Sequence, residues 1–309
     1  MDEQTLEDEV KLNARLFDAL ENSDIFEVDK IIQMGANVNA IRMRDGETPL
    51  LIATGKGDLA MMELLLLYGA AIHRIDANGN YAIHRATRLG HLEGVKLLMD
   101  NGSLAFVGNR NFDTPLMIAS MHGHTEIVKY LLSKNIPMMY QLNRKARSEL
   151  TLATAQGHID IVTLLLDKGD PSKDRAIELN QALRIAVNAN NLEIIRILLD
   201  SGADPNTKDM VGIPLIMIPL SRRKELIVRQ LLLKGTDIET RDSNGYTLLM
   251  RSIILGDANF VRMFIKLGAN LNAIQTNGTA TALSLAKFYE DPEIIEIVEN
   301  ALKEDEGRT

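Results

Sequence analysis

Residues 114–123, TPLMIASMHG, decide the fold, because they return at residues 48–57 as TPLLIATGKG. Weaker copies follow at a nearly constant step of 32 to 34 residues. The positions equivalent to Thr48 are 14, 48, 81, 114, 148, 181, 213, 247 and 281. Nine units at this step fill the chain, so the sequence predicts one repeat array, a single domain over residues 1–309.

The residue types within a unit predict its local structure. Thr114 is suited to cap a helix through its hydroxyl, and Pro115 follows at the first helical position, where a missing N–H costs nothing. Gly123 is suited to end that helix in the left-handed conformation. A second helix is predicted over residues 125–134, and turn sequences such as Asp-Ser-Asn-Gly at 242–245 predict a hairpin after it. One helix pair cannot bury its own apolar stripe, so stability must come from stacking.

Composition narrows the class of protein. The 309 residues are 25% charged and 46% hydrophobic, which is typical of a globular chain. Thirty-four Lys and Arg face 42 Asp and Glu, and the net charge of −8 argues against binding nucleic acid or anionic membranes. Cysteine is absent, which excludes disulfides, zinc–thiolate sites and thiol catalysis. With an acidic start and no long apolar run, we expect a cytoplasmic protein that does not enter a membrane.

The repeated segments resemble the ankyrin-repeat family. The resemblance is carried by GETPL at 46–50, GHTEIV at 123–128, GANVN at 35–39 and GADPN at 202–206. It implies an all-α solenoid of about nine stacked repeats, with capping repeats at both ends. The expected repeats span residues 10–42, 43–75, 76–108, 109–142, 143–175, 176–208, 209–241, 242–274 and 275–309. The resemblance also implies a protein-binding scaffold.

Motifs of catalysis are missing from the sequence. There is no phosphate-binding loop, no H-E-x-x-H, no G-x-S-x-G and no EF-hand loop. His91, His124 and His158 each follow a helix-ending Gly, where the resemblance implies hydrogen bonds to neighbouring backbone, and His84 also has a structural family position. Only His122 has no expected structural role. We therefore expect no enzyme activity, cofactor or metal.

The resemblance implies that partners bind the hairpin tips and the first helix of each unit. Basic side chains dominate those places in units two to five: residues 42–147 carry a net charge of +4, between flanks of −7 and −5. The predicted partner-binding residues there are Arg42, Arg44, Lys56, Arg85, Arg88, Arg110, Met121, His122, Arg144, Lys145 and Arg147. They favour a partner protein or peptide with an acidic segment, steered by charge. The alternative is an ordinary fluctuation of surface charge.

Nucleic acid ranks below a protein partner, because the chain is acidic and we expect no aromatic side chains among these cations to stack bases.

Large apolar side chains replace the usual Gly-Ala-Asp-x-Asn pattern in two connections between units, at residues 103–107 and 136–140. Phe106, Met138, Met139 and Tyr140 are predicted as apolar anchors, unless neighbouring tips pack together and cover them.

Pro219 is expected to distort a short helix and to bend the array locally. We expect a monomeric adaptor. The alternatives are an effector that an intracellular bacterium or parasite delivers into host cytosol, and more remotely an enzyme with an unrecognised site.

Overall fold

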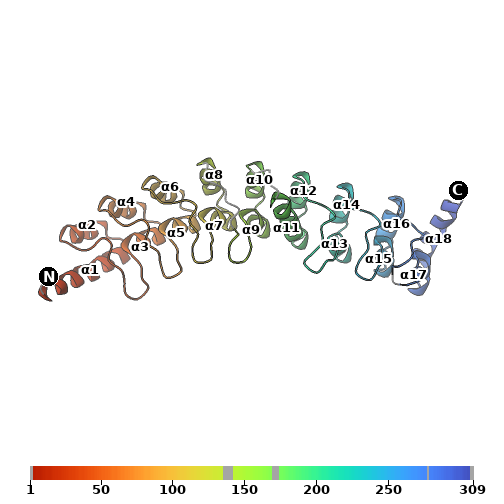
Figure 1. Cartoon of the computed structure of the whole chain (residues 1–309), viewed down its shortest axis with the longest axis horizontal. Helices are drawn as coiled ribbons and strands as arrows, with labels where there is room; N and C mark the ends of the chain where they lie inside the picture. The colour runs from red at the N-terminus through yellow and green to blue at the C-terminus, as the bar shows by residue number, and fades with distance from the viewer. Residues whose placement is uncertain (1–2, 135–141, 169–173, 277, 307–309) are drawn as a thin grey trace. The chain divides into compact units, whose positions relative to one another are not determined.

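The computed structural model describes residues 3–134, 142–168, 174–276 and 278–306, which form two compact units, Met1–Lys168 and Gly169–Thr309 (Figure 1). These described residues contain 18 helices, and consecutive helices pack together in pairs. The predicted all-α repeat architecture is therefore confirmed. The count of nine repeats, their boundaries and their union in one domain stay predictions, because each unit is described by itself.

Unit 1 stacks five helix pairs in two layers, with the first helices in one row and the second helices in the other (Figure 1). The pairs are α1 (Glu3–Glu21) and α2 (Ile25–Gln33), α3 (Pro49–Lys56) and α4 (Leu59–Leu67), α5 (Ala82–Arg88) and α6 (Leu92–Asp100), α7 (Pro115–His122) and α8 (Thr125–Ser133), and α9 (Glu149–Gln156) and α10 (Ile159–Asp167).

Unit 2 contains four further pairs. They are α11 (Asp174–Asn188) and α12 (Leu192–Asp200), α13 (Met217–Ser221) and α14 (Glu225–Leu233), α15 (Leu248–Ile254) and α16 (Ala258–Lys266), and α17 (Ala282–Phe288) and α18 (Pro292–Glu306). Among the described residues, no helix is both long and apolar enough to span a bilayer.

Helix α7 begins and ends as its sequence predicts. The Thr114 hydroxyl accepts a hydrogen bond from the Met117 N–H at 3.2 Å, and Gly123 ends the helix with a φ of 79°. The apolar side chains of α8 are buried, namely Ile127, Val128, Leu131 and Leu132, and that helix ends at Ser133, one residue earlier than expected. Local caps set the ends of these helices, and apolar burial against neighbouring pairs holds them in place.

The hairpins are built on a recurring side-chain turn. The Oδ1 of Asn109 accepts from the N–H groups of Asn111 and Asp113, at 2.9 and 3.0 Å. Asp76, Asn143, Asp209 and Asp242 make the same pair of bonds to the residues two and four positions later. Asx side chains suit this role because they hydrogen-bond the backbone nearby. The hairpin tips are thus fixed by their own sequence.

Side chains of one repeat satisfy the last carbonyls of the preceding first helix. The Nε2 of His124 lies 3.0 Å from the Arg88 carbonyl oxygen, and that of His158 lies 3.3 Å from the Met121 oxygen. The predicted backbone bonds of these two histidines are therefore confirmed. For His91 the prediction does not hold, because within the described residues neither ring nitrogen makes such a bond and the buried Nδ1 has no partner.

Helix α13 is distorted where Pro219 was expected to distort it. A helix beginning at Pro214, as the repeat spacing predicts, would need an N–H at Pro219 to reach the Leu215 carbonyl, and the proline ring would clash with that oxygen. Instead, residues 215–216 form a turn and α13 begins at Met217, with only five residues. The bend of the array there stays untested.

Candidate partner-binding site

Arg42 is committed to the interior of unit 1. Its side chain is only 13% exposed and pairs with Glu21, with Asp45 at 2.7 Å and with Glu47 at 2.9 Å. The hydrogen bond from Arg42 lowers the pKa of Asp45 to about 2. Three carboxylates already neutralise this guanidinium, so it is poorly suited to bind an acidic partner protein. Because Glu21 belongs to α1 while Asp45 and Glu47 belong to the first hairpin, Arg42 connects these two elements.

Arg85 has a similar internal role. Its side chain is 17% exposed, and its Nη2 donates to Glu47 at 2.5 Å and to Asp76 at 2.9 Å. Its Nη1 donates to the Leu51 carbonyl at 3.1 Å, which ties α5 to α3. Two more predicted residues lie near Glu21: Arg44 pairs with its carboxylate at 2.8 Å, and Lys56 donates to backbone oxygens at the end of α1. The contacts of these four cations connect the first three helix pairs of unit 1, although the Arg44 side chain is itself 67% exposed.

Three other predicted arginines meet at one open hollow of about 400 Å³, which we call the arginine hollow. It is lined by Asn78, Asn80, Arg88, Asn109, Arg110, Asn111 and Arg144. The three arginines are exposed, and they come from the end of α5 and from the two following hairpins. In the described parts of the chain, no carboxylate forms an ion pair with any of them. The hollow is therefore a concentration of unbalanced positive charge.

Hydrogen bonds between neighbouring hairpins fix the backbone around the hollow. The N–H of Arg110 donates to the Asn78 carbonyl at 3.4 Å, and the N–H of Arg144 donates to the Asn111 carbonyl at 2.8 Å. Below them, the Asn109 amide donates to Asn80 Oδ1 at 3.0 Å. These bonds join three consecutive repeats at the hollow, so the backbone positions from which Arg110 and Arg144 extend keep a fixed spacing.

Phe112 belongs to this surface, and the sequence reasoning missed it. The Arg144 guanidinium carbon lies 5.3 Å from the centre of the Phe112 ring, and Phe112 is 54% exposed. The expectation that no aromatic side chain lies among the cations is therefore wrong. The sequence did contain a signal, because Phe112 stands where the hairpins at 76–80, 209–213 and 242–246 have glycine. In the structure its φ is 61°, which is unusual for a residue with a Cβ.

The remaining predicted residues are dispersed. Lys145 and Arg147 are exposed on the same hairpin as Arg144, and no ion pair is found for either within the described residues. Met121 is half-buried, while His122 is exposed and stacks on His124 with 6.0 Å between ring centres.

Burial and the charges of His124 and Arg88 lower the pKa of His122.

Among the four predicted apolar anchors, Phe106 is 46% exposed. Met138, Met139 and Tyr140 lie outside the described residues.

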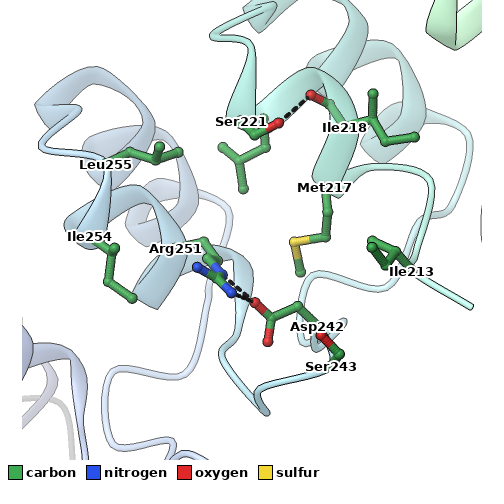
Figure 2. A pocket seen from close by; sticks show the side chains of 10 residues that line it. Ile213, Met217, Ile218, Ser221, Asp242, Ser243, Arg251, Ile254 and Leu255 are labelled. Carbon is green, nitrogen blue, oxygen red and sulfur yellow. Dashed lines mark hydrogen bonds and ion pairs between the residues drawn. The ribbon is translucent and has the colours of Figure 1, made fainter. Parts of the chain in front are cut away.

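Unit 2 has a different pocket, of about 270 Å³, between α13 and α15 (Figure 2). Its wall is apolar, with Met217, Ile254 and Leu255 among the lining residues, and the Arg251–Asp242 ion pair lies at one side. The sequence reasoning missed this pocket as well.

In the residues that the structure describes, no group of three or more acidic or histidine side chains could hold a metal ion. Asn and Arg alone line the arginine hollow, so it offers neither a general base nor a nucleophile. The expected absence of enzyme activity and cofactors stays a prediction.

Comparisons with known proteins connect this architecture to a family. A family model of three ankyrin repeats matches residues 16–105, 103–176, 139–209 and 217–304. A mouse B-cell lymphoma 3 protein homolog is 32% identical over 99 residues, 32% of this chain and 22% of that protein. The tyrosine-protein kinase HTK16 of Hydra vulgaris is 36% identical over 132 residues, 41% of this chain and 17% of the kinase.

A third relative, a mouse fem-1 homolog A-like protein, is 37% identical over 91 residues, 29% of this chain and 14% of that protein. The match thus spans less than a quarter of the length of each of these three relatives. What they share with this chain is the repeat and not a whole protein. Since the family model covers most of the residues, the chain belongs to the ankyrin-repeat family.

Proposed function

We propose that this protein is a non-enzymatic adaptor that binds an acidic segment of a partner protein on unit 1. Ankyrin repeats are generally protein–protein interaction modules, and the acidic partner is the specific part of the proposal. One observation carries it: Arg88, Arg110, Arg144, Lys145 and Arg147 are exposed, and within the described residues they have no carboxylate partners.

The contrast with the internal cations supports this choice. Arg42 and Arg85 are largely covered and neutralised by acidic side chains, so their conformation is explained by the fold alone. The exposed cations have no such explanation. Positive charge gathered on one surface of an otherwise acidic chain would attract an acidic partner and orient it during encounter.

The cytoplasmic location and the monomeric state belong to this proposal. The absence of cysteine is consistent with a reducing compartment, where disulfides are rare. Sedimentation of the purified protein as a single chain would support the monomer, and a concentration-dependent dimer would contradict it.

A selection from a random peptide library displayed on phage tests the proposed partner. We expect wild-type protein to enrich acidic peptides, and an Arg110→Glu/Arg144→Glu/Arg147→Glu variant to lose that enrichment. The matched control is Arg196→Glu/Lys266→Glu/Lys303→Glu, which makes the same charge change at exposed positions of unit 2. Equal enrichment by the two variants, or selection of neutral peptides by wild type, would contradict the proposal.

A further inference from the structure

We propose that the arginine hollow is a phosphate subsite, which takes a phosphorylated side chain within the acidic segment of the partner. This inference rests on the proposed function and adds the chemistry of one side chain to it. The ligand is a phosphomonoester on a peptide, and the residues that would bind it are Arg88, Arg110 and Arg144.

The number of arginines at the hollow exceeds what a carboxylate needs. One guanidinium satisfies one carboxylate through two parallel hydrogen bonds. A phosphorylated side chain carries a charge of about −1.5 to −2 and three acceptor oxygens near neutral pH, so it suits several guanidinium groups at once. Three arginines from three consecutive repeats at one hollow of about 400 Å³ match the larger anion.

The other lining residues add donors and no negative charge. Asn78 and Asn111 use their backbone groups in the hairpins, and over the described ranges their side-chain amides make no hydrogen bond. Of the nearby carboxylates, Asp76 pairs with Arg85 at 2.9 Å and Asp113 accepts from the Asn143 amide at 2.8 Å, and neither lines the hollow. An entering dianion would therefore be surrounded by lining residues that carry donors and no carboxylate.

The hollow is also organised before any ligand arrives. Hydrogen bonds between hairpins fix the backbone at Arg110 and Arg144, and the Phe112 ring supports the Arg144 guanidinium. Phe112 keeps its position despite a φ of 61°, in the left-handed region that residues with a Cβ disfavour. Side chains that are already ordered lose less entropy when they bind.

The arrangement favours a phosphopeptide over a nucleic acid. A single strand needs a groove of cations that follows its backbone, with aromatic side chains spaced to stack successive bases. Here three arginines gather on one hollow, with one neighbouring aromatic ring, and the whole chain has a net charge of −8.

Two synthetic peptide libraries test the inference on the full-length protein. Both have randomised acidic and small flanking residues, with phosphoserine fixed at the centre of one and glutamate at the centre of the other. We expect fluorescence anisotropy to show roughly tenfold tighter binding of the phosphoserine library, the effect of one added charge-assisted contact. Equal binding of the two libraries would overturn the phosphate subsite and leave the proposed function standing. Failure of both libraries to bind would overturn the two proposals together.

A conservative variant assigns the effect to the hollow. Arg110→Lys/Arg144→Lys keeps both charges but removes the planar pair of donors, so it should abolish most of the phosphoserine preference while binding of the glutamate library changes by about twofold or less. The matched control, Arg196→Lys/Arg229→Lys, should keep the full preference. A preference that survives in the hollow variant would overturn the assignment, and so would a single-stranded oligonucleotide that displaces the phosphoserine library at lower concentration.

Discussion

Arg85 and Arg88 lie three residues apart on α5, and the structure gives them opposite roles. Arg85 bridges Glu47 and Asp76, whereas Arg88 extends into the arginine hollow without an acidic partner among the described residues. The sequence alone made both residues candidates for partner binding. A distinguishing signal existed, because Asp76 and Arg85 are nine residues apart, as are Asp242 and Arg251, which form the equivalent ion pair.

Alanine at these two arginines should separate structure from binding. Arg85→Ala leaves Asp76 and Glu47 without their shared cation, and we expect the free energy of unfolding to fall by about 2–3 kcal/mol, below the range for fully buried pairs. Arg88→Ala should change it by less than about 0.5 kcal/mol. Urea titrations measure both changes, and similar losses for the two variants would contradict the assigned roles.

His84 should make stability depend on pH. Its Nδ1 accepts a hydrogen bond from the Tyr81 N–H at 3.1 Å, which requires the neutral ring, and its Nε2 lies 2.9 Å from the Val107 carbonyl oxygen. Burial lowers the pKa of His84 to about 4, whereas the unfolded chain titrates near 6.5. Between these pH values the unfolded state binds more protons, so stability should fall by about 3 kcal/mol as the pH drops from 6.5 to 4.

His84→Asn provides the control for this pH effect. Its amide oxygen still accepts from Tyr81 but does not titrate, so the variant should lack this component and keep the contributions of His122 and of the carboxylates. Urea titrations across the pH range measure the difference between wild type and variant. If the two curves run parallel from pH 6.5 to 4, His84 is not the titrating group.

Ala146 has the same left-handed conformation as Phe112, with a φ of 54°. We expect Ala146→Gly to raise the free energy of unfolding by about 0.5–1 kcal/mol, because relief of backbone strain exceeds the added entropy of the unfolded chain. The matched control is Gly212→Ala, at the equivalent position in another hairpin, where φ is 86° and a new Cβ would meet no atom within 4 Å. It should destabilise by about 1–2 kcal/mol. A loss of stability in Ala146→Gly would contradict the assigned strain.

At the scale of the element, the sequence predicted the ends of the first helix in the clearest repeats, because local chemistry sets them. Thr48 and Thr114 cap helices that Gly57 and Gly123 end, and each signal lies within its own ten-residue segment. Three helices depart from the repeat spacing: α1 and α11 begin earlier than positions 14 and 181 imply, and α13 was anticipated as a distortion at Pro219 but not as a late start. Its three-residue delay depends on which carbonyl the proline ring would meet, and that became visible only in the folded backbone.

Pro219→Ala should lengthen α13 toward Pro214. Alanine restores the N–H that a helix including Leu215 requires, and it removes the clash with that carbonyl. Amide hydrogen exchange of residues 216–220 measures the change, and we expect greater protection with an earlier helix start. An unchanged exchange pattern would mean that the Leu215–Thr207 backbone hydrogen bond, and not the proline, fixes the start.

At the scale of the whole molecule, periodicity made the fold predictable and left the site open. Similar sequence segments recur every 32 to 34 residues, and this recurrence predicts a repeat architecture because every unit packs on its neighbours in the same way. A binding surface depends on which side chains remain without partners after packing, and that is a property of three neighbouring repeats at once. The net charge of residues 42–147 pointed to the part of the chain that contains the arginine hollow, but it could not separate Arg42 from Arg110.

The most direct test of the central claim is the affinity of unit 1 cations for an acidic peptide. We would measure it by fluorescence anisotropy with a labelled peptide of alternating glutamate and serine, at about 0.01 M and about 0.1 M salt, between which the screening length falls from about 30 Å to about 10 Å. The account predicts binding that weakens with salt, and a further loss of about tenfold or more in Arg110→Glu/Arg144→Glu, with Arg196→Glu/Lys266→Glu close to wild type. Equal affinities in all three proteins, or no salt dependence, would contradict it.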